Sequence, residues 1–435
     1  MWAYESVFYQ IYPLGACGAH FENDGKPEKR LKKLDAYVPH LKKLGVKGVL
    51  FNPLFDSDTH GYNTRDYRKV DVRLGDNADF KKLVDKLHKA GIKVILDAVF
   101  NHVGRGFWGF TDVLEKRERS EYKDWFHINF GGNNGYNDGL WYEGWEGNFD
   151  LVKLNLQNPA VTDYLIDTVR YWIDTFDIDG LRLDVAYCLD QNFIRRLRYE
   201  SSQMKEDFFL MGEMIGGDYR NICGEGLCDS ATNYECYKGL FSSMNSYNLF
   251  EITHSLLRQF GPENWTLYRG MHLWSFVDNH DVTRVSSILA NPEHIKPIYA
   301  LMCGMPGIPS IYYGSEWGFK ADKSQGDPAL RPMFDKPLWN ELTDYIKGCV
   351  SAFQSSKALQ YGAFKSLVLQ NKACVWERET DDDRVLVACN IDGAPFTAHF
   401  DARAGQAVDL ITGEMIDFGG GLEIPPYTAY ILKPQ

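Results

Sequence analysis

Three acidic residues directly follow three separate apolar runs of the chain. They are Asp184 after Gly-Leu-Arg-Leu, Glu213 after Leu-Met-Gly, and Asp281 after Asn-His. Each apolar run predicts a strand, so each acid stands where a strand ends and its loop begins. In a (β/α)₈ barrel, catalytic groups come from the C-terminal ends of several different strands. Two carboxylates on either side of a glycosidic bond are the minimum needed to hydrolyse it.

The composition predicts a large globular protein without a nucleic-acid partner. The chain has 435 residues, 44% of them hydrophobic, and one barrel with smaller appended domains fits this length better than several equal domains. The formal net charge is −12, and Lys and Arg form only short runs such as Lys29-Arg30 and Lys32-Lys33. These features argue against a nucleic-acid ligand. Aromatic residues make up 14% of the chain, which suits either a large aromatic core or loops that stack on sugars.

Targeting and metal-binding signals are missing from the sequence. The first residues carry neither the basic nor the long apolar segment of a signal peptide, and no apolar run reaches membrane-spanning length. The 9 cysteines are scattered, often in apolar contexts typical of reduced, buried thiols. Cys223 and Cys228 are the closest pair, but no second pair or histidine with zinc-like spacing accompanies them. We expect a cytoplasmic protein without membrane contact and without a zinc site.

Apolar runs alternate with helical patterns along most of the chain. Helices are predicted around 34–44, 80–87 and 161–172, the last after Asn158-Pro159, a capping residue followed by proline at the first helical position. Strands are predicted near 7–12, 46–51, 92–97, 178–184, 208–213, 231–237, 273–278 and 308–314, the sixth being the least clear. Alternation at this spacing is typical of a parallel sheet, and we expect a (β/α)₈ TIM barrel.

The alternation breaks in two places, and these breaks predict the domains. The segment 103–150 is rich in Gly, Asn, Trp and Tyr, and a connection that long is usually functional or a small domain of its own. We expect an inserted domain there that lines the active site. The catalytic barrel would then comprise residues 1–102 and 151–357. Residues 358–435 show short alternating runs, which predict a C-terminal antiparallel β-sandwich domain.

Four short motifs stand at the predicted ends of strands three, four, five and seven. In chain order they are Asp97-Ala-Val-Phe-Asn101-His102, Gly180-Leu-Arg182-Leu-Asp184, Met211-Gly-Glu213 and Phe276-Val-Asp-Asn279-His280-Asp281. Each motif alone is weak, but the four in this order resemble the α-amylase superfamily, glycoside hydrolase family 13. The resemblance covers nearly the whole chain and implies that the protein is a glycoside hydrolase.

The resemblance also implies roles for the acidic residues. Asp184 would be the nucleophile, and Arg182, two residues earlier on the same strand face, would keep it ionised by pairing with it. Glu213 would be the general acid and base, with a pKa raised by partial burial and neighbouring negative charge. Asp281 would hold the hydroxyls of the distorted sugar. Nucleophile and acid would lie about 5–5.5 Å apart, as in enzymes that retain anomeric configuration.

Substrate-binding residues are implied in the same way. His102 and His280 would donate hydrogen bonds to the sugar at the reacting centre. Tyr62, in a His-Gly-Tyr segment, would stack on the glucose unit being cleaved. Asp327 and Arg331 resemble the pair that grips glucose units on the non-reducing side, although a surface ion pair is an equal alternative.

One further segment bears on the substrate. Val152-Lys-Leu-Asn155 resembles a signature of the neopullulanase and cyclomaltodextrinase branch, which implies α-1,4-linked maltooligosaccharides or cyclodextrins as substrates.

The sequence also departs from that branch. The branch usually has an N-terminal domain that helps form dimers, whereas here the barrel begins within ten residues of Met1, so we expect a monomer or weak homo-oligomer. Tyr187-Cys188 replaces the Lys-His of many starch-degrading amylases. No cofactor is required, but Asn101 matches a position that contributes to a structural calcium site in many relatives.

Three alternatives remain at this point. An α-glucan transglycosylase would share the first half of the mechanism and pass the glycosyl group to a sugar. A barrel metallohydrolase needs clustered histidines, typically His-x-His ending strand one, where this chain has Tyr9-Gln-Ile-Tyr12. A non-enzymatic binding subunit would be expected to have lost its carboxylates, and this chain keeps all three.

Overall fold

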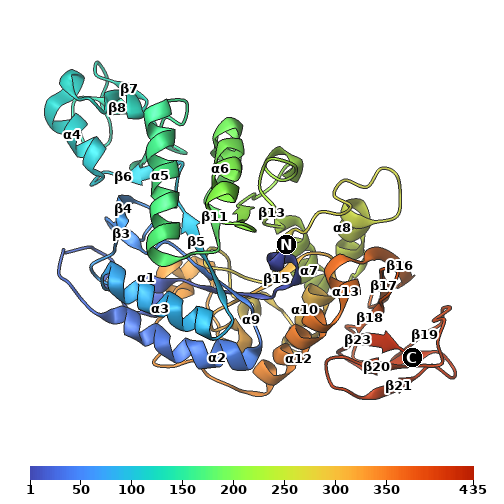
Figure 1. The fold of residues 1–435 in the computed structure, drawn as a ribbon. Helices are drawn as coiled ribbons and strands as arrows, with labels where there is room; N and C mark the ends of the chain where they lie inside the picture. Colours follow the sequence, from blue (N-terminus) through green and yellow to red (C-terminus); the bar gives the residue numbers. More distant parts are fainter.

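The computed structural model describes residues 1–435, and its largest element is an 8-stranded parallel sheet with the order β13-β12-β11-β5-β2-β1-β15-β14 (Figure 1). Its strands are β1 (Phe8–Ile11), β2 (Gly48–Phe51), β5 (Lys93–Ala98), β11 (Gly180–Leu183), β12 (Phe209–Gly212), β13 (Ser230–Ala231), β14 (Trp274–Phe276) and β15 (Ile308–Tyr312). A parallel bridge between Thr232 and Trp274 joins the two edges. The backbone N–H of Asn233 also donates to the carbonyl of Trp274 at 2.9 Å. The predicted barrel is therefore confirmed.

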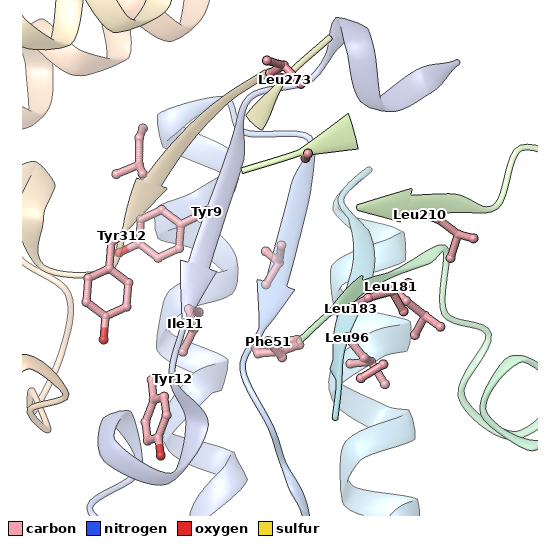
Figure 2. Packing of buried hydrophobic residues seen from close by; sticks show 14 of the residues in the cluster. Tyr9, Ile11, Tyr12, Phe51, Leu96, Leu181, Leu183, Leu210, Leu273 and Tyr312 are labelled. Atoms are coloured by element: carbon pink, nitrogen blue, oxygen red, sulfur yellow. The ribbon is translucent and has the colours of Figure 1, made fainter. Parts of the chain in front are cut away.

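Side chains of the barrel strands alternate between its interior and the surrounding helices. One set of these side chains, which includes Phe8, Leu50 and Ile95, packs together in a cluster inside the barrel. The alternate residues, such as Tyr9 and Phe51, belong to the larger core beneath the helices (Figure 2). Both faces of each strand are buried, which explains why these strands read as nearly continuous apolar runs.

Helices cover the outside of the barrel. The longer ones are α2 (Tyr37–Leu44), α3 (Asn77–Lys89), α5 (Pro159–Phe176), α6 (Gln191–Met204), α7 (Tyr234–Ser246), α8 (Phe250–Phe260), α10 (Ile295–Gly304) and α12 (Glu341–Ser355). Short helices are α1 (Pro13–Ala16), α9 (Val285–Ile288), α11 (Asp327–Leu330) and α13 (Lys357–Tyr361). The cap predicted before α5 is present, because the Asn158 side chain accepts from Ala160 N–H. No helix combines the length and the apolarity needed to cross a membrane.

The prediction of a sixth strand over 231–237 is wrong for most of its length. The strand is only Ser230–Ala231, and Asn233 caps helix α7 by accepting from Cys236 N–H. The aromatic residues Tyr234 and Tyr237, which favour a strand in isolation, lie instead on the first turn of the helix. The local cap and the helical spacing of buried residues further along decide the structure here.

The segment after β5 leaves the barrel and forms small elements of its own. It contains α4 (Trp108–Lys116), a hairpin of β7 (Ile128–Asn129) and β8 (Trp141–Tyr142), and a three-stranded sheet of β6 (His102–Gly104), β10 (Asn148–Lys153) and β9 (Gly144–Trp145). A further hairpin, β3 (Phe55–Ser57) with β4 (Thr64–Val70), follows β2. Figure 1 shows the inserted segment projecting from one side of the barrel.

The C-terminal part is antiparallel, as predicted. Its 6-stranded sheet consists of β16 (Ala363–Leu369), β17 (Ala373–Glu379), β18 (Arg384–Asn390), β23 (Thr428–Pro434), β20 (Gln406–Asp409) and β21 (Met415–Asp417). The pair β19 (Phe396–Ala398) and β22 (Leu422–Ile424) forms a second small sheet. A separate apolar cluster that includes Leu386 and Ile424 joins the two sheets.

Candidate active site

Three adjacent strands bring four charged residues into one buried cluster. Arg182 on β11 is in register with Asp97 on β5, and both side chains turn toward the interior of the barrel. Arg182 Nη1 lies 2.7 Å from Asp97 Oδ1 and 2.9 Å from Asp184 Oδ1, and Nη2 lies 2.6 Å from Glu213 Oε1. The predicted Arg182–Asp184 pair is present, and the guanidinium also pairs with Asp97 and Glu213, two contacts that were not predicted from the sequence.

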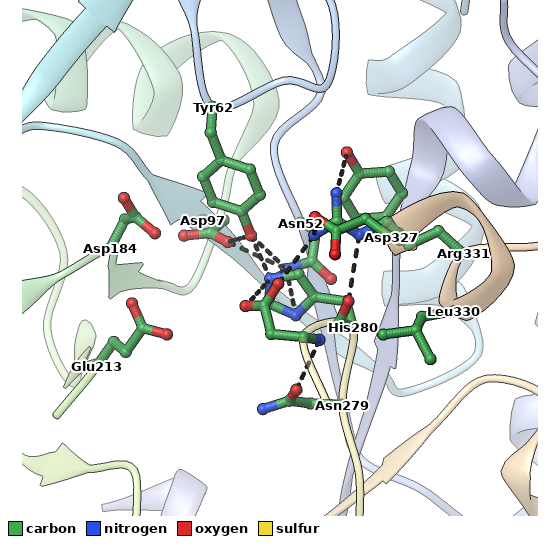
Figure 3. Close-up of polar contacts among 12 residues, drawn as sticks. Asn52, Tyr62, Asp97, Asp184, Glu213, Asn279, His280, Asp327, Leu330 and Arg331 are labelled. Atoms are coloured by element: carbon green, nitrogen blue, oxygen red, sulfur yellow. Dashed lines mark hydrogen bonds and ion pairs between the residues drawn. The ribbon is translucent and has the colours of Figure 1, made fainter. Parts of the chain in front are cut away.

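Asp184 and Glu213 occupy equivalent positions just beyond the ends of neighbouring strands. The backbone N–H of Glu213 donates to the carbonyl of Leu183 at 2.9 Å, which continues the pairing of β11 with β12. The backbone N–H of Val185 donates to Glu213 Oε2 at 2.9 Å. Val185 has φ +39°, which is unusual for a β-branched residue, so the chain accepts backbone strain to aim this N–H. Figure 3 shows the carboxyl groups of Asp184 and Glu213 side by side.

Asp281 approaches from the β14 side with two partners of its own, His280 and Arg331. Its Oδ2 lies 2.9 Å from His280 Nε2, and its Oδ1 lies 2.8 Å from Arg331 Nη2. The same Arg331 nitrogen lies 3.1 Å from Asp327 Oδ2. The Asp281 side chain is 36% exposed, so it can still contact a ligand. Asp327 and Arg331 are thus joined to the cluster rather than forming an isolated surface pair.

A hydrogen-bonded group behind the carboxylates fixes Tyr62 and His280. Their rings are stacked at 5.7 Å with an interplanar angle of 8° (Figure 3). The Tyr62 hydroxyl donates to Asp97 Oδ2 at 2.9 Å. Gln10 Nε2 donates to His280 Nδ1 at 2.9 Å and also to Asn52. This leaves His280 Nε2–H to be shared by the Tyr62 hydroxyl oxygen at 2.5 Å and Asp281 at 2.9 Å. Gln10 and Asn52 carry no motif of their own, so only the tertiary structure reveals these positioning roles.

His102 presents a free N–H beside Asp184. Asn101 Nδ2 donates to His102 Nδ1 at 3.1 Å, so the proton of a neutral ring is on Nε2. That Nε2 is buried without a hydrogen-bond partner and lies 3.9 Å from Asp184 Oδ2. Burial lowers the pKa of His102 to about 3, so the ring is neutral at pH 7. An unused buried donor at this place suits a ligand hydroxyl.

These residues surround one cavity of about 490 Å³ at the C-terminal ends of the strands. Of the predicted site residues, Arg182 and His280 lie behind the wall and the others line it. The full lining comprises His60, Tyr62, His102, Trp145, Asn148, Leu151, Asp184, Val185, Glu213, Ile215, Tyr234, Asp281, Val282, Lys323, Asp327 and Arg331. A larger hollow of about 700 Å³ near Lys47 and Lys93 lies at the opposite ends of the strands and has only Glu5 as an acidic lining residue.

Burial and crowding of negative charge raise the pKa of both Asp184 and Glu213. For each carboxyl, burial is the largest cause and Arg182 opposes it. Glu213 then raises the pKa of Asp184, and Asp281 raises that of Glu213. The prediction for Glu213 agrees with this direction, whereas pairing with Arg182 alone does not offset the burial of Asp184. One cation shared by three carboxylates favours a proton held between Asp184 and Glu213.

Asp281 is shifted in the opposite direction. Burial acts to raise its pKa, but His280, Arg331 and Arg182 together outweigh burial and hold the pKa below its usual range. Asp281 is therefore ionised over the range in which the other two carboxyls titrate. Carboxyl groups with separated pKa values provide distinct acid and anion roles within one site.

Replacing Glu213 by Gln is expected to stabilise the folded protein at neutral pH. The folded-state pKa of Glu213 is raised above its ordinary value of 4.5. As the pH rises above that value, Glu213 ionises more readily in the unfolded chain than in the folded protein, so the free energy of unfolding of wild type falls until the folded-state pKa is passed. Gln does not ionise. The Tm of Glu213→Gln should exceed that of wild type by about 1–3 °C at pH 7, and the gap should close toward pH 4. Thermal unfolding at several pH values measures this, and an unchanged gap across the range would contradict the raised pKa.

The residues around Asn101 do not assemble a carboxylate-rich metal site. The Asn101 side chain is buried and donates to His102. No group of three or more His, Cys, Asp or Glu side chains is placed to hold a metal ion. Calcium generally takes six to eight oxygen ligands with carboxylates among them.

The family model described as alpha amylase, catalytic domain, matches residues 31–382. The chain belongs to the alpha-amylase family. It is a glycoside hydrolase, as the four motifs predicted. The alpha-amylase model spans all of β2 to β17 and every predicted site residue.

Individual relatives of this alpha-amylase family member agree with that assignment. A cyclomaltodextrinase from a Bacillus species is 32% identical over 91% of this chain and 74% of its own length. An intracellular maltogenic amylase from Bacillus subtilis is 32% identical over 82% of this chain and 63% of its own length. The solved cyclic alpha-maltosyl-(1→6)-maltose hydrolase from Arthrobacter globiformis superposes with a TM-score of 0.83 at 26% identity, covering 99% of this chain and 98% of that one.

Proposed function

We propose that this protein is a retaining α-glucan hydrolase that cleaves α-1,4-glucosidic bonds of maltooligosaccharides and cyclodextrins through a covalent glycosyl-enzyme intermediate. The observation that carries the proposal is the shared pairing of Arg182 with Asp184 and Glu213, opposite the ionised Asp281. The relatives named cyclomaltodextrinase and maltogenic amylase support the substrate class. The Bacillus subtilis relative also supports an intracellular location, which cell fractionation would test.

In the first step, the Asp184 carboxylate attacks the anomeric carbon from the β face. The bond from that carbon to the glycosidic oxygen breaks, and the proton on Glu213 passes to the departing oxygen. A β-glycosyl ester on Asp184 and a free sugar hydroxyl result. Charge develops on the ring, and the Asp281 carboxylate, held ionised by His280 and Arg331, binds the ring hydroxyls and stabilises it.

In the second step, Glu213 acts as a base. Its carboxylate takes a proton from water, the resulting oxygen attacks the anomeric carbon, and the ester bond to Asp184 breaks. Two inversions give a product with the α configuration of the substrate. The neutral His102, with its free Nε2–H beside Asp184, donates to a hydroxyl of the same sugar in both steps.

The polar end of the cavity suits the non-reducing part of the substrate. Tyr62 offers a ring face fixed by its hydroxyl, and Asp327 and Arg331 offer charged hydrogen-bonding groups. Asp327 also pairs with Lys323 Nζ at 2.5 Å, and Lys323 lines the same cavity. Lys323 was not found from the sequence, because a lone loop lysine carries no pattern.

Replacing Asp327 by Asn is expected to weaken substrate binding more than chemistry. Asp327 pairs with Arg331 and Lys323 rather than with Asp184 or Glu213 and is 45% exposed, so we expect its substrate contacts to form in the bound substrate and in the transition state alike. KM for maltoheptaose should rise about 5–20-fold with kcat nearly unchanged. Steady-state kinetics provides the measurement, with exposed Asp163→Asn as the control. A fall in kcat with unchanged KM would contradict this expectation, because it would mean that Asp327 acts on the transition state rather than on substrate binding.

An apolar wall beside Glu213 favours glycosyl transfer as a second activity. Ile215, which is 54% exposed, Val282 and Tyr234 line this side of the cavity. Such a wall offers a sugar acceptor a binding surface and gives water few partners. Products longer than the substrate that persist on dilution would identify a transglycosylase, and their absence at high substrate concentration would rule it out.

The proposal is tested by analysing the products of wild type and Glu213→Gln on maltoheptaose, β-cyclodextrin, pullulan and soluble starch. We expect cleavage of the first two and weak action on starch, since Tyr187-Cys188 replaces the Lys-His of many starch-degrading enzymes. NMR of the first product formed should show the α anomer. A first product of β configuration would contradict retention, and activity on none of the four substrates would contradict the substrate class.

A further inference from the structure

A smaller cavity, of about 190 Å³, lies far from the carboxylates of the candidate active site. His272 and Gly307 line it just before β14 and β15, so it is at the N-terminal ends of the strands, opposite the catalytic site. Its other wall is the turn from α13 into β16 together with Arg378 of β17. Figure 1 shows α13, β16 and β17 against the barrel beside α8. The cavity is therefore at the junction of the barrel and the C-terminal domain.

Arg378 carries a buried positive charge without a carboxylate partner. The residue is 1% exposed. Its Nε and Nη2 donate to the carbonyl of Gly362, and its Nη1 donates to the carbonyl of Gly304. A guanidinium has five N–H groups, so two remain without a protein acceptor. Arg182, the comparable buried arginine of the active site, pairs with three carboxylates.

The surroundings of Arg378 do not neutralise it. Burial alone lowers its pKa to about 9, and no acidic neighbour offsets that effect. The group is still charged at pH 7, and a buried charge is costly unless an opposite charge or full hydrogen bonding compensates it. The two helix-end carbonyls it contacts give partial compensation only.

The remaining lining adds another cation and no acid. Arg269 donates to the backbone carbonyls of Gly261 and Glu263 and has no ion pair. His272 is neutral, because burial lowers its pKa to about 4. Tyr361, which lines the cavity, donates its hydroxyl to Glu5 at 2.8 Å, and Glu5 is not part of the lining. Two arginines without an acid are unexpected in a chain whose net charge is −12.

We propose that this cavity binds a small oxyanion, either inorganic phosphate or the phosphoryl group of a phosphomonoester, between Arg378 and Arg269. The fork of N–H groups on an arginine matches the spacing of phosphate oxygens. The cavity has room for a tetrahedral anion, and the exposed Arg269 forms its outer side. A bound anion would connect β17 to the loop before β14 and so fasten the C-terminal domain to the barrel.

The experiment is thermal unfolding of the full chain in increasing phosphate, against potassium chloride at equal ionic strength. A ligand that binds only the folded state raises Tm. We expect phosphate to raise Tm by about 2–4 °C more than chloride does. Glucose 6-phosphate is titrated in the same way. A greater effect from the ester than from phosphate would identify a phosphomonoester, and an equal or smaller one would identify free phosphate.

Two variants assign the effect to this cavity. Arg378→Met removes the buried charge while keeping the length of the side chain, and Arg269→Gln removes the exposed one with little risk to folding. Each should weaken apparent phosphate affinity at least tenfold and leave cleavage of maltoheptaose unchanged. Arg220→Gln, an exposed arginine elsewhere, should behave as wild type. The proposal is overturned by equal Tm shifts in phosphate and chloride, or by a phosphate effect that Arg269→Gln retains in full.

Discussion

Asp184→Ala is expected to lower kcat/KM on maltoheptaose by roughly 10⁴–10⁶-fold, because it removes the proposed nucleophile. Added azide should then restore part of the activity. Azide fits the space left by the carboxylate and attacks the anomeric carbon from the same β face, so the product should be a β-glycosyl azide. Steady-state kinetics with and without azide, followed by NMR of the product, measures both effects.

The control for this variant is Asp163→Ala on helix α5, whose side chain is 59% exposed and remote from the cavity. It should retain wild-type kinetics. Two results would contradict the assignment of Asp184 as nucleophile. One is activity of Asp184→Ala within about tenfold of wild type, and the other is an α-configured azide product.

Glu213→Gln is expected to lose more activity on substrates whose leaving group must be protonated than on substrates whose leaving group departs without a proton. Its kcat/KM on maltoheptaose should fall by roughly 10²–10⁴-fold, because a sugar hydroxyl departs poorly without a proton. Fluoride departs without protonation, so kcat/KM on α-maltosyl fluoride should fall far less. The measurement is the ratio of the two specificity constants in wild type and variant.

The matched control is Glu225→Gln, an exposed glutamate on the same loop after β12. It should leave both specificity constants unchanged. An equal loss on the two substrates in Glu213→Gln would mean that the residue does not protonate the leaving group. If neither specificity constant falls in Glu213→Gln, the general acid is another residue.

The barrel and the positions of Asp184 and Glu213 at the ends of its strands could be predicted from the sequence because both depend on short-range patterns. A strand buried on both faces must be apolar along its length, so β5, β11 and β12 are visible as runs, and the polar residue after each run must lie at its C-terminal end. Parallel strands all end at the same side of the barrel, which brings Asp184 and Glu213 together without further information. The bounds of the sixth strand were predicted wrongly, because the strand has only two residues and a capped helix follows it at once.

Only the tertiary structure decided how the charges of the site are partitioned. Arg182 pairs with Asp97 and Glu213 as well as Asp184, because the register of three strands places all of them around one guanidinium. Gln10 orients His280 across 270 positions of sequence. Such contacts depend on the distance between side chains after folding, and no local spacing encodes that distance. The sequence by itself therefore indicated the candidate reacting groups, and the fold decided how charge is shared among them.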